Sequence, residues 1–349
     1  MQYSSSAISA NTARTYAKAV GRYQIFCIAQ GWDPSPAAVT AVTAAEFIAA
    51  LGKEGRLCAR TIGVHRSAVS TWRLQSTLAD GPNPLQSVAV ERVIKGIARE
   101  RQPIEAAAQS QRTPTIEVTP ALLAAIQPWL FPRPPRGGTP HQLMVWGAAN
   151  VATYALLRPS ELLGSPHWQH PGRALLAKQI TFYMTRGSDH VGELGPFGVD
   201  PTTLPLPDHF TIALGPTKAD QQGLNPPIAV AAQPAVHALW LWMHARRDRG
   251  PGADHPQLFS NPGFGPLRLF ELTAAIADAC VESGRERPHI TGRAFRRGGA
   301  SGLMAGGAAR PAIRAAGRWR SDAMGEIYAS RQSKAERALE ASRAMAPRS

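Results

Sequence analysis

Residues 292–301, GRAFRRGGAS, place three arginines within five positions and follow them with four small residues. Arginine suits the binding of phosphate, because its planar guanidinium donates paired hydrogen bonds and keeps its charge at any working pH. A cluster of arginines can also be a solvated surface and nothing more. The small residues at 298–301 would let a helix pack closely behind the cluster. The stretch therefore raises the question of what Arg293, Arg296 and Arg297 hold.

The overall charge indicates a polyanionic partner. The chain has 349 residues, with 38 Lys and Arg against 24 Asp and Glu, so its net charge is +14. Such an excess favours nucleic acid, although an acidic membrane surface would also attract it. No apolar run approaches the roughly 18 residues that span a bilayer, and the first residues lack the order of a secretory signal. We therefore expect a DNA- or RNA-binding protein without a membrane span.

The three cysteines favour an intracellular protein. Cys27, Cys58 and Cys280 are odd in number and widely spaced, in apolar or helical contexts. They are predicted to be reduced, buried thiols rather than a disulfide framework or a metal site. The expected location is the cytoplasm or nucleoid of a prokaryotic or viral system, or the nucleus of a eukaryote.

Residues 1–101 are predicted to form a helical domain. Apolar spacing indicates a helix over 12–29, and the pattern TAAE at 43–46 is typical of a capping box with Thr43 as N-cap and Glu46 reaching back. Further helices are expected over 59–77 and 88–101. At roughly 150 residues per domain, the chain has room for a second domain after this one.

The helix over 59–77 has two distinct faces. Ile62, Val69 and Trp72 fall on its apolar side, and no acidic residue occurs from 55 to 79. The opposite side is either a solvated polar face or a surface laid against a DNA backbone, since arginine, serine and threonine are frequent phosphate donors. The missing acids favour the second reading, which assigns DNA contacts to four residues: Arg66, Ser70, Arg73 and Thr77.

A linker and a larger domain are expected to follow. Residues 102–119 are rich in small and polar residues and are predicted to be an extended linker. Thr119 and Pro120 are typical of a helix start, and helices continue to about 335, before a tail over 336–349. Short β-rich segments between 173 and 232 predict an inserted sheet. The expected fold is mainly α with a small antiparallel β-sheet.

Four stretches of the second domain carry candidate chemistry, and their order is informative. ALLRPSELLG (155–164) contains Arg158 and Glu161, and LGPTKADQQG (214–223) contains Lys218 at the tip of an expected hairpin. GRAFRRGGAS (292–301) supplies the arginine cluster, and AGRWRSDAMGEIYAS (316–330) carries Trp319 and Tyr328. Each stretch alone is a weak signal, because a lone helical arginine or hairpin lysine is usually a solvated surface residue.

Taken together, these stretches resemble the tyrosine recombinase (phage integrase) family. Its catalytic domain carries R-x-x-E/D, a hairpin lysine, H-x-x-R, G-H/W and a nucleophilic tyrosine, in that order. The resemblance extends from about residue 8 to 335, and the helical domain at 1–101 is similar to the family's core-binding domain, which clamps DNA. The amino-acid sequences of the last two stretches are most similar to those of recombinases from phages and mobile elements. The resemblance therefore implies a core-binding domain followed by a tyrosine-recombinase catalytic domain at 120–335.

The resemblance implies a role for each residue. Arg158 and Arg296 would neutralise the scissile phosphate, and Tyr328 would attack it to form a 3′-phosphotyrosyl intermediate. Lys218 would protonate the departing 5′ oxygen. Glu161 would support the arginines, and Trp319 would pack or donate its indole N–H near the phosphate. Arg297 would be a contact to the neighbouring DNA backbone or a structural ion-pair partner.

The implied partners are double-stranded DNA and further copies of the chain. The resemblance suggests a monomer or dimer when free and a homotetramer on two duplexes. Covalent capture conserves the energy of the phosphodiester bond, so no metal, no ATP and no other cofactor is expected. Two alternatives stay open: a catalytically impaired DNA-binding protein derived from a recombinase, and an enzyme like type IB topoisomerase.

Arg293 is the one departure from the family pattern. When Arg296 is aligned with the arginine of H-x-x-R, Arg293 stands in the position of the histidine. Arginine can contact phosphate but cannot shuttle a proton. Either Arg293 is a tolerated variant and Lys218 supplies the acid, or the enzyme is slow or inactive. We favour retained activity, because the other catalytic positions are filled. His289 could partly substitute if its stretch were helical.

Overall fold

The computed structural model divides the chain into two compact units, Met1–Arg112 and Thr113–Ser349. It describes residues 10–77, 82–110, 115–131, 139–164, 174–185, 191–194, 206–215, 226–247, 257–261 and 265–319. The boundary between the units falls inside the stretch 102–119 that the sequence marks as a linker. Each unit has its own hydrophobic core, so we describe the two separately.

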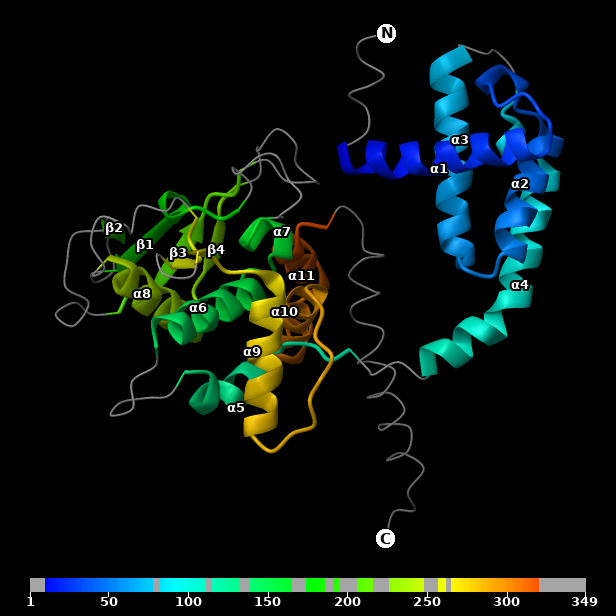
Figure 1. Ribbon diagram of the computed structural model, residues 1–349. Helices are drawn as coiled ribbons and strands as arrows, with labels where there is room; N and C mark the ends of the chain where they lie inside the picture. Colours follow the sequence, from blue (N-terminus) through cyan, green and yellow to red (C-terminus); the bar gives the residue numbers. More distant parts are fainter. Residues whose placement is uncertain are drawn as a thin grey trace. The chain divides into compact units, whose positions relative to one another are not determined.

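The first unit is helical, as predicted. Its core packs Tyr23 of α1 edge-on against Phe47 of α2, over the buried side chains of Ile62 and Val69 from α3. In Figure 1, α1 lies across α3, and α2 and α4 run beside α3. The elements are α1 (Ala10–Ala29), the short 3-10 turn η2 (Pro36–Ala38), α2 (Ala41–Lys53), α3 (Ala59–Thr77), η3 (Pro84–Gln86) and α4 (Val88–Ser110).

Two expectations for the first unit are wrong. Thr40, not Thr43, is the N-cap of α2; its hydroxyl accepts the N–H of Thr43, which occupies the third helical position. The stretch 102–110 is not extended but continues α4 to Ser110. Arg101 donates to the carbonyl of Leu57, and Glu105 accepts the N–H of Ala59 at 3.4 Å. These contacts with the start of α3 hold the last turns of α4 against the unit.

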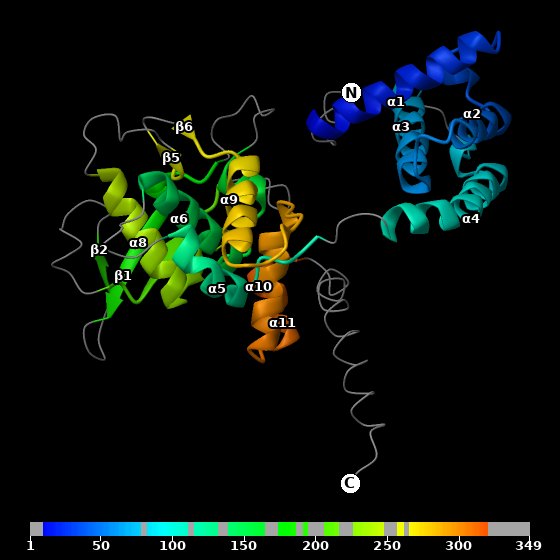
Figure 2. The ribbon, with the colours of Figure 1, turned by 60° about the horizontal axis from the view of Figure 1, so that its bottom comes forward.

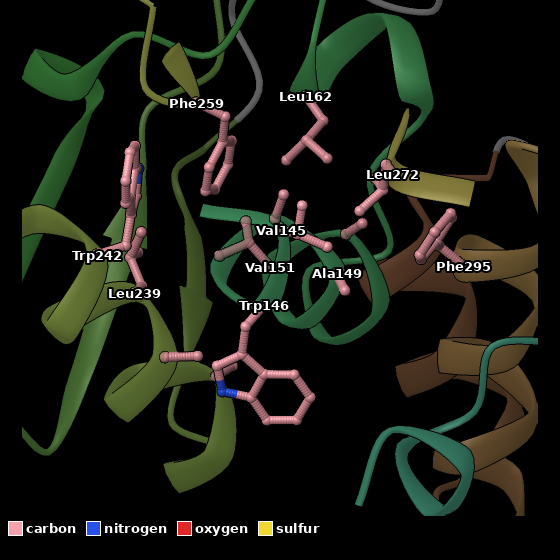
Figure 3. Close-up of a cluster of buried hydrophobic side chains, with 14 of the residues drawn as sticks. Val145, Trp146, Ala149, Val151, Leu162, Leu239, Trp242, Phe259, Leu272 and Phe295 are labelled. Carbon is pink, nitrogen blue, oxygen red and sulfur yellow. The ribbon is translucent and has the colours of Figure 1, made fainter. Parts of the chain in front are cut away.

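The second unit is built around the buried helix α6 (Pro140–Tyr154). Figure 3 shows Val145, Ala149 and Val151 of this helix at the centre of the core, between Trp242 of α8 on one side and Phe295 of α10 on the other. Figure 2 shows α5, α9 and α10 on the side of α6 that lies away from β1 and β2. The flanking helices are α5 (Pro120–Leu130), α8 (Gln233–Arg247) and α9 (Leu269–Glu282). Thr119 caps α5 before Pro120, as predicted.

The inserted sheet is antiparallel, which confirms the predicted fold class. Its strands follow the order β2-β1-β3-β4, and Phe182 of β1 packs edge-on against Trp240 of α8. The connection from β3 to β4 contains Lys218, which lies outside the described residues. The strands are β1 (Ile180–Thr185) after the turn η5 (Ala177–Gln179), β2 (Val191–Leu194), β3 (His209–Ile212), β4 (Ile228–Val230), and a separate pair β5 (Ser260–Asn261) and β6 (Gly265–Pro266).

The small residues after the arginine cluster allow the closest packing in the second unit. They lie on α10 (Arg293–Ala305), where Gly298 and Gly299 are buried. A Cβ atom at Gly298 would lie 2.0 Å from the carbonyl oxygen of Val118, and one at Gly299 would lie 2.0 Å from that of Thr153. The glycines of this run thus pack closely, but against segments that precede them in the chain. The backbone of α10 therefore touches both α6 and the segment that leads into α5.

We predict that Gly299→Ala destabilises the second unit by about 3 kcal/mol or more, because the added methyl meets backbone that cannot move aside. Chemical denaturation followed by circular dichroism measures the loss. Gly306→Ala is the matched control, since its Cβ would lie 3.4 Å from the nearest carbonyl, an ordinary contact. Equal stability of Gly299→Ala and Gly306→Ala would contradict the close packing.

The cysteine prediction is wrong at one position. Cys27 and Cys280 are buried as expected, but Cys58 is exposed just before α3, with its sulfur 3.1 Å from the hydroxyl of Thr61. This hydrogen bond is the main cause of a lowered Cys58 thiol pKa. Separately, no helix in the described parts of the chain is long and apolar enough to cross a membrane.

Candidate active site

The sequence predicts eight residues for catalysis, for its support and for the arginine cluster. Six of these eight lie in the described part of the second unit. They come from α7 (Pro159–Leu162), from α10 and from the end of α11 (Arg310–Gly317). Lys218 and Tyr328 lie outside the described residues. The six described residues are Arg158, Glu161, Arg293, Arg296, Arg297 and Trp319.

Arg158 and Glu161 are tied together at the start of α7. Arg158 is the N-cap residue, and its backbone N–H donates to Oε2 of Glu161 at 2.9 Å. Its side-chain Nη1 donates to Oε1 of the same carboxylate at 2.5 Å. The Glu161 side chain is 7% exposed and that of Arg158 is 31% exposed. The carboxylate therefore anchors the arginine while part of the guanidinium stays open to solvent.

Arg296 is buried at the junction of α6, α10 and α11. It lies one turn into α10, where its Nη1 donates to the carbonyl of Leu156 at 2.5 Å and its Nη2 donates to the carbonyl of Gly317. Its guanidinium carbon lies 5.3 Å from the centre of the Trp319 ring, which is within range of a cation–π contact. Trp319 thus packs against the arginine, while its expected place near the phosphate stays a prediction.

Gly317 explains how Trp319 reaches this position. A Cβ atom on Gly317 would lie 2.6 Å from the indole ring, so the ring folds directly over the glycine backbone. The same residue presents its carbonyl to Arg296. Gly317 thus allows the Trp319 ring to pack against the backbone, and the buried Arg296 guanidinium packs against that ring.

Arg293 is the first residue of α10 and is exposed. Its neighbour Gly292 packs against the start of α7, where a Cβ atom would lie 2.4 Å from the Pro159 side chain. Arg293 and Arg158 are therefore the chain neighbours of the two residues, Gly292 and Pro159, that make this contact. A cation at a helix N-terminus is unfavourable, by about 0.3–1 kcal/mol, because the first N–H groups already carry positive charge. The same arrangement is favourable for an anion.

Arg297 turns away from this cluster. Its Nη2 donates to Oε1 of Glu117 at 2.7 Å, and the hydroxyl of Ser301 donates to the other carboxylate oxygen at 2.5 Å. Of the two roles left open for Arg297, the structure favours the structural ion pair. Glu117 precedes α5, so this pair ties the entry segment of the unit to α10.

One residue of the cluster was missed by sequence reasoning. Arg318 follows α11, and its Nη2 donates both to Oε2 of Glu161 at 3.0 Å and to the carbonyl of Leu156 at 3.1 Å. Burial lowers the pKa of this guanidinium, Glu161 opposes the shift, and the charge of Arg158 adds to it. Its position between Gly317 and Trp319, inside a quoted motif, was the available signal.

Three of the four residues predicted to contact DNA from α3 are partly buried. Ser70 accepts a hydrogen bond from the side-chain amide of Asn83 at 2.5 Å, and Arg66 lies 4.0 Å from Glu91. Arg73 is half-buried, and the side chain of Thr77 lies outside the described set. Ser70 and Arg66 thus have partners inside the first unit, and a DNA contact from this face stays a prediction.

His289 does not stand one helical turn before Arg293. The stretch before α10 is not helical; instead His289 pairs with Thr115 in an isolated bridge, and its Nδ1 lies 3.3 Å from the Thr115 hydroxyl. Its ring is therefore engaged with the segment before α5. Over the described ranges, no group of three or more His, Cys, Asp or Glu side chains is placed to hold a metal ion.

The cluster as a whole carries an excess of positive charge. Arg158 and Arg318 share the carboxylate of Glu161, while Arg296 is held by carbonyl oxygens. In the described part of the chain, two guanidinium groups thus meet at one buried carboxylate, and Arg296 joins them through the Leu156 carbonyl that it shares with Arg318. Such a site stabilises a bound anion, and its planar donors suit the oxygens of a phosphate.

The fold is similar to solved structures of a site-specific recombinase. The XerH site-specific recombinase in a post-cleavage complex with palindromic difH substrate matches with a TM-score of 0.55 and 15% identity, over 93% of this chain and 78% of that chain. The pre-cleavage complex of XerH with difH matches with a TM-score of 0.50 and 15% identity, over 85% and 69%. No protein-family model and no curated protein matches the sequence. The likeness confirms the tyrosine-recombinase fold that the motifs implied.

Proposed function

We propose that this protein is a site-specific DNA recombinase that cleaves and rejoins strands through a 3′-phosphotyrosyl intermediate. The observation that carries the proposal is the pair of Arg158 with Glu161 and the packing of Arg296 on Trp319, linked through Arg318 and the Leu156 carbonyl, in a fold similar to that of a recombinase crystallised on its DNA substrate. The partner is double-stranded DNA, and a homotetramer on two duplexes is the proposed assembly.

The proposed reaction exchanges one phosphodiester bond for another. Tyr328 gives up its phenolic proton to solvent and attacks the phosphorus as the phenolate, the bond to the 5′ oxygen breaks, and that oxygen takes a proton from Lys218. The two arginines neutralise the non-bridging oxygens as charge builds up on them in the transition state. Return attack by a 5′ hydroxyl from another strand releases the tyrosine and completes the exchange. Since each bond formed replaces a bond of similar energy, the exchange needs no external energy source.

The proposal is tested first by finding the DNA that the protein binds. Rounds of binding to duplexes of random sequence, at moderate salt, yield a selected duplex. A set of such duplexes then carries a bridging sulfur in place of the 5′ oxygen at successive positions. Sulfur leaves without a general acid and rejoins poorly, so an adduct accumulates whether or not Lys218 acts. A covalent adduct whose tryptic peptide contains Tyr328 supports the proposal; bound duplexes that never form an adduct overturn it.

A second candidate is a DNA-binding protein without catalysis. The observation that favours it is Arg293, which occupies the exposed first position of α10 where the family pattern has histidine. Selected duplexes without adduct formation would support this candidate over the first.

Arg293→His separates the two roles of this position. If Arg293 supplies charge to the phosphate, the wild-type cleavage rate is flat from pH 6 to 8, because arginine stays protonated. The histidine variant then cleaves at a similar rate near pH 6 and loses about 25-fold by pH 8, as an imidazole with a pKa near 6.5 loses its charge. Single-turnover adduct formation against pH measures both. A histidine variant that is faster than wild type at pH 7.5 would instead mean that Arg293 impairs proton transfer.

A further inference from the structure

Two strained residues meet inside the arginine cluster. Among the described residues, the non-glycine residues with positive φ are Leu156, at +49°, and Arg318, at +51°. Each closes a helix in the left-handed position that glycine usually fills: Leu157 N–H bonds back to Ala152 after α6, and Trp319 N–H bonds back to Arg314 after α11. A side chain in this conformation costs roughly 1 kcal/mol or more.

These two residues bond to each other. The carbonyl of Leu156 accepts from Nη2 of Arg318 at 3.1 Å and from Nη1 of Arg296 at 2.5 Å. The left-handed turn at Leu156 aims this carbonyl at both guanidinium groups. The same Nη2 of Arg318 reaches Oε2 of Glu161 at 3.0 Å, on the carboxylate that holds Arg158. Arg318 thus links the support of Arg158 with the support of Arg296.

Arg318 is also expensive to bury. Its side chain is 13% exposed, and its Nε and Nη1 are buried without a hydrogen-bond partner in the described structure. Buried unpaired donors cost stability and are uncommon in folded proteins. Glycine at 318 would relieve the left-handed strain and remove these unpaired donors. A residue that served stability alone would not combine both costs.

We infer that Arg318 is a positioning residue of the phosphate site, which holds Arg158 through Glu161 and Arg296 through the Leu156 carbonyl. This inference rests on the proposed function. We assign Arg318 to positioning and not to the phosphate, because its Nη2 bonds both supports and its Nε and Nη1 are buried. Its effect on cleavage passes through the charge that the two other arginines present to the non-bridging oxygens.

The test compares Arg318→Gly and Arg318→Met with the wild-type full chain on the selected duplex. Met keeps the backbone strain and the bulk of the side chain, whereas Gly removes both. We expect both variants to bind the duplex within a few-fold of wild type and to form adduct about 100-fold more slowly, as for the loss of organised transition-state charge. We also expect Arg318→Gly to melt no lower than wild type, and if Arg318→Met fails to fold, the glycine variant carries the test alone.

A second substrate separates positioning from general damage to the fold. A methylphosphonate at the cleaved position replaces one charged oxygen with a methyl group, so less charge needs to be neutralised. If Arg318 acts through the arginines, its loss should cost less than about tenfold on this substrate, against about 100-fold on the phosphate. Equal losses on both substrates, full activity of the glycine variant, or a clear fall in its melting temperature would overturn the inference. Absence of adduct in the wild-type protein would overturn the proposed function instead, and the positioning role with it.

Discussion

Replacing Tyr328 with phenylalanine should abolish the covalent adduct with the bridging-sulfur duplex. The phenolic oxygen is the atom proposed to attack phosphorus, and phenylalanine lacks that atom and nothing else. In the proposed reaction, the guanidinium groups that bind the phosphate favour the phenolate and so activate the attacking hydroxyl. Binding of the selected duplex should stay within about twofold, because phosphate contacts by basic side chains dominate DNA affinity.

The measurement is adduct formation on a denaturing gel, with DNA binding followed in parallel. The other tyrosines offer matched controls. Tyr154, at the end of α6, is half-buried, and burial raises the pKa of its phenol. Tyr154→Phe should therefore form adduct like wild type. An adduct that persists in Tyr328→Phe would show that another nucleophile attacks, and would contradict the assignment.

Arg296→Lys should slow adduct formation by about 100- to 1,000-fold, the range found when one organised donor to a transition state is lost. Arg296 reaches two carbonyls with two nitrogens while its planar face rests on Trp319. A lysine keeps the charge but has one nitrogen, so it cannot hold both carbonyls and still donate to phosphate. The variant should bind DNA within a few-fold of wild type, which places the loss in the chemical step.

Arg287→Met is the control for Arg296→Lys. Arg287 is exposed and pairs with Asp278 on the surface of the same unit, with side-chain exposures of 58% and 54%. Its loss removes a positive charge outright, yet adduct formation should stay within about threefold, because exposed pairs contribute little. Similar losses in the two variants would mean that overall charge, and not the position of Arg296, sets the rate.

Local patterns in the sequence were sufficient for most helices. The periodicity over 59–77 matches α3 residue for residue, and Thr119 with Pro120 starts α5 as expected. The error at Thr43 arose because Thr40 and Thr43 both fit a capping pattern, and the side-chain bonds that decide between them depend on where the chain enters the helix. The amino-acid composition of 102–110 also gave a wrong prediction, that of an extended linker. Contacts of Arg101 and Glu105 with backbone distant in the sequence instead stabilise the continuation of α4.

The candidate site was predictable where residue type decides the chemistry. Arg158 pairs with Glu161 and Arg296 packs on Trp319, while the catalytic roles that the motifs imply for them stay predictions. Arg318 was not recognised, because its role depends on a left-handed turn and on a carbonyl of Leu156 from a distant helix. The ion pair of Arg297 with Glu117 likewise joins residues far apart in the chain, and no local pattern indicates it.

The contact between the entry segment and α10 determines where this protein can be divided into fragments. Ile116 and Val118 donate backbone hydrogen bonds to His289 and Ala294, and Gly298 lies directly beneath the Val118 carbonyl. A fragment that starts at residue 120, the boundary suggested by composition, would lose these backbone contacts. The glycine face of α10 would then be exposed to water. A fragment that starts at Thr113 keeps them. The short stretch that resembles a spacer is therefore a structural part of the second unit.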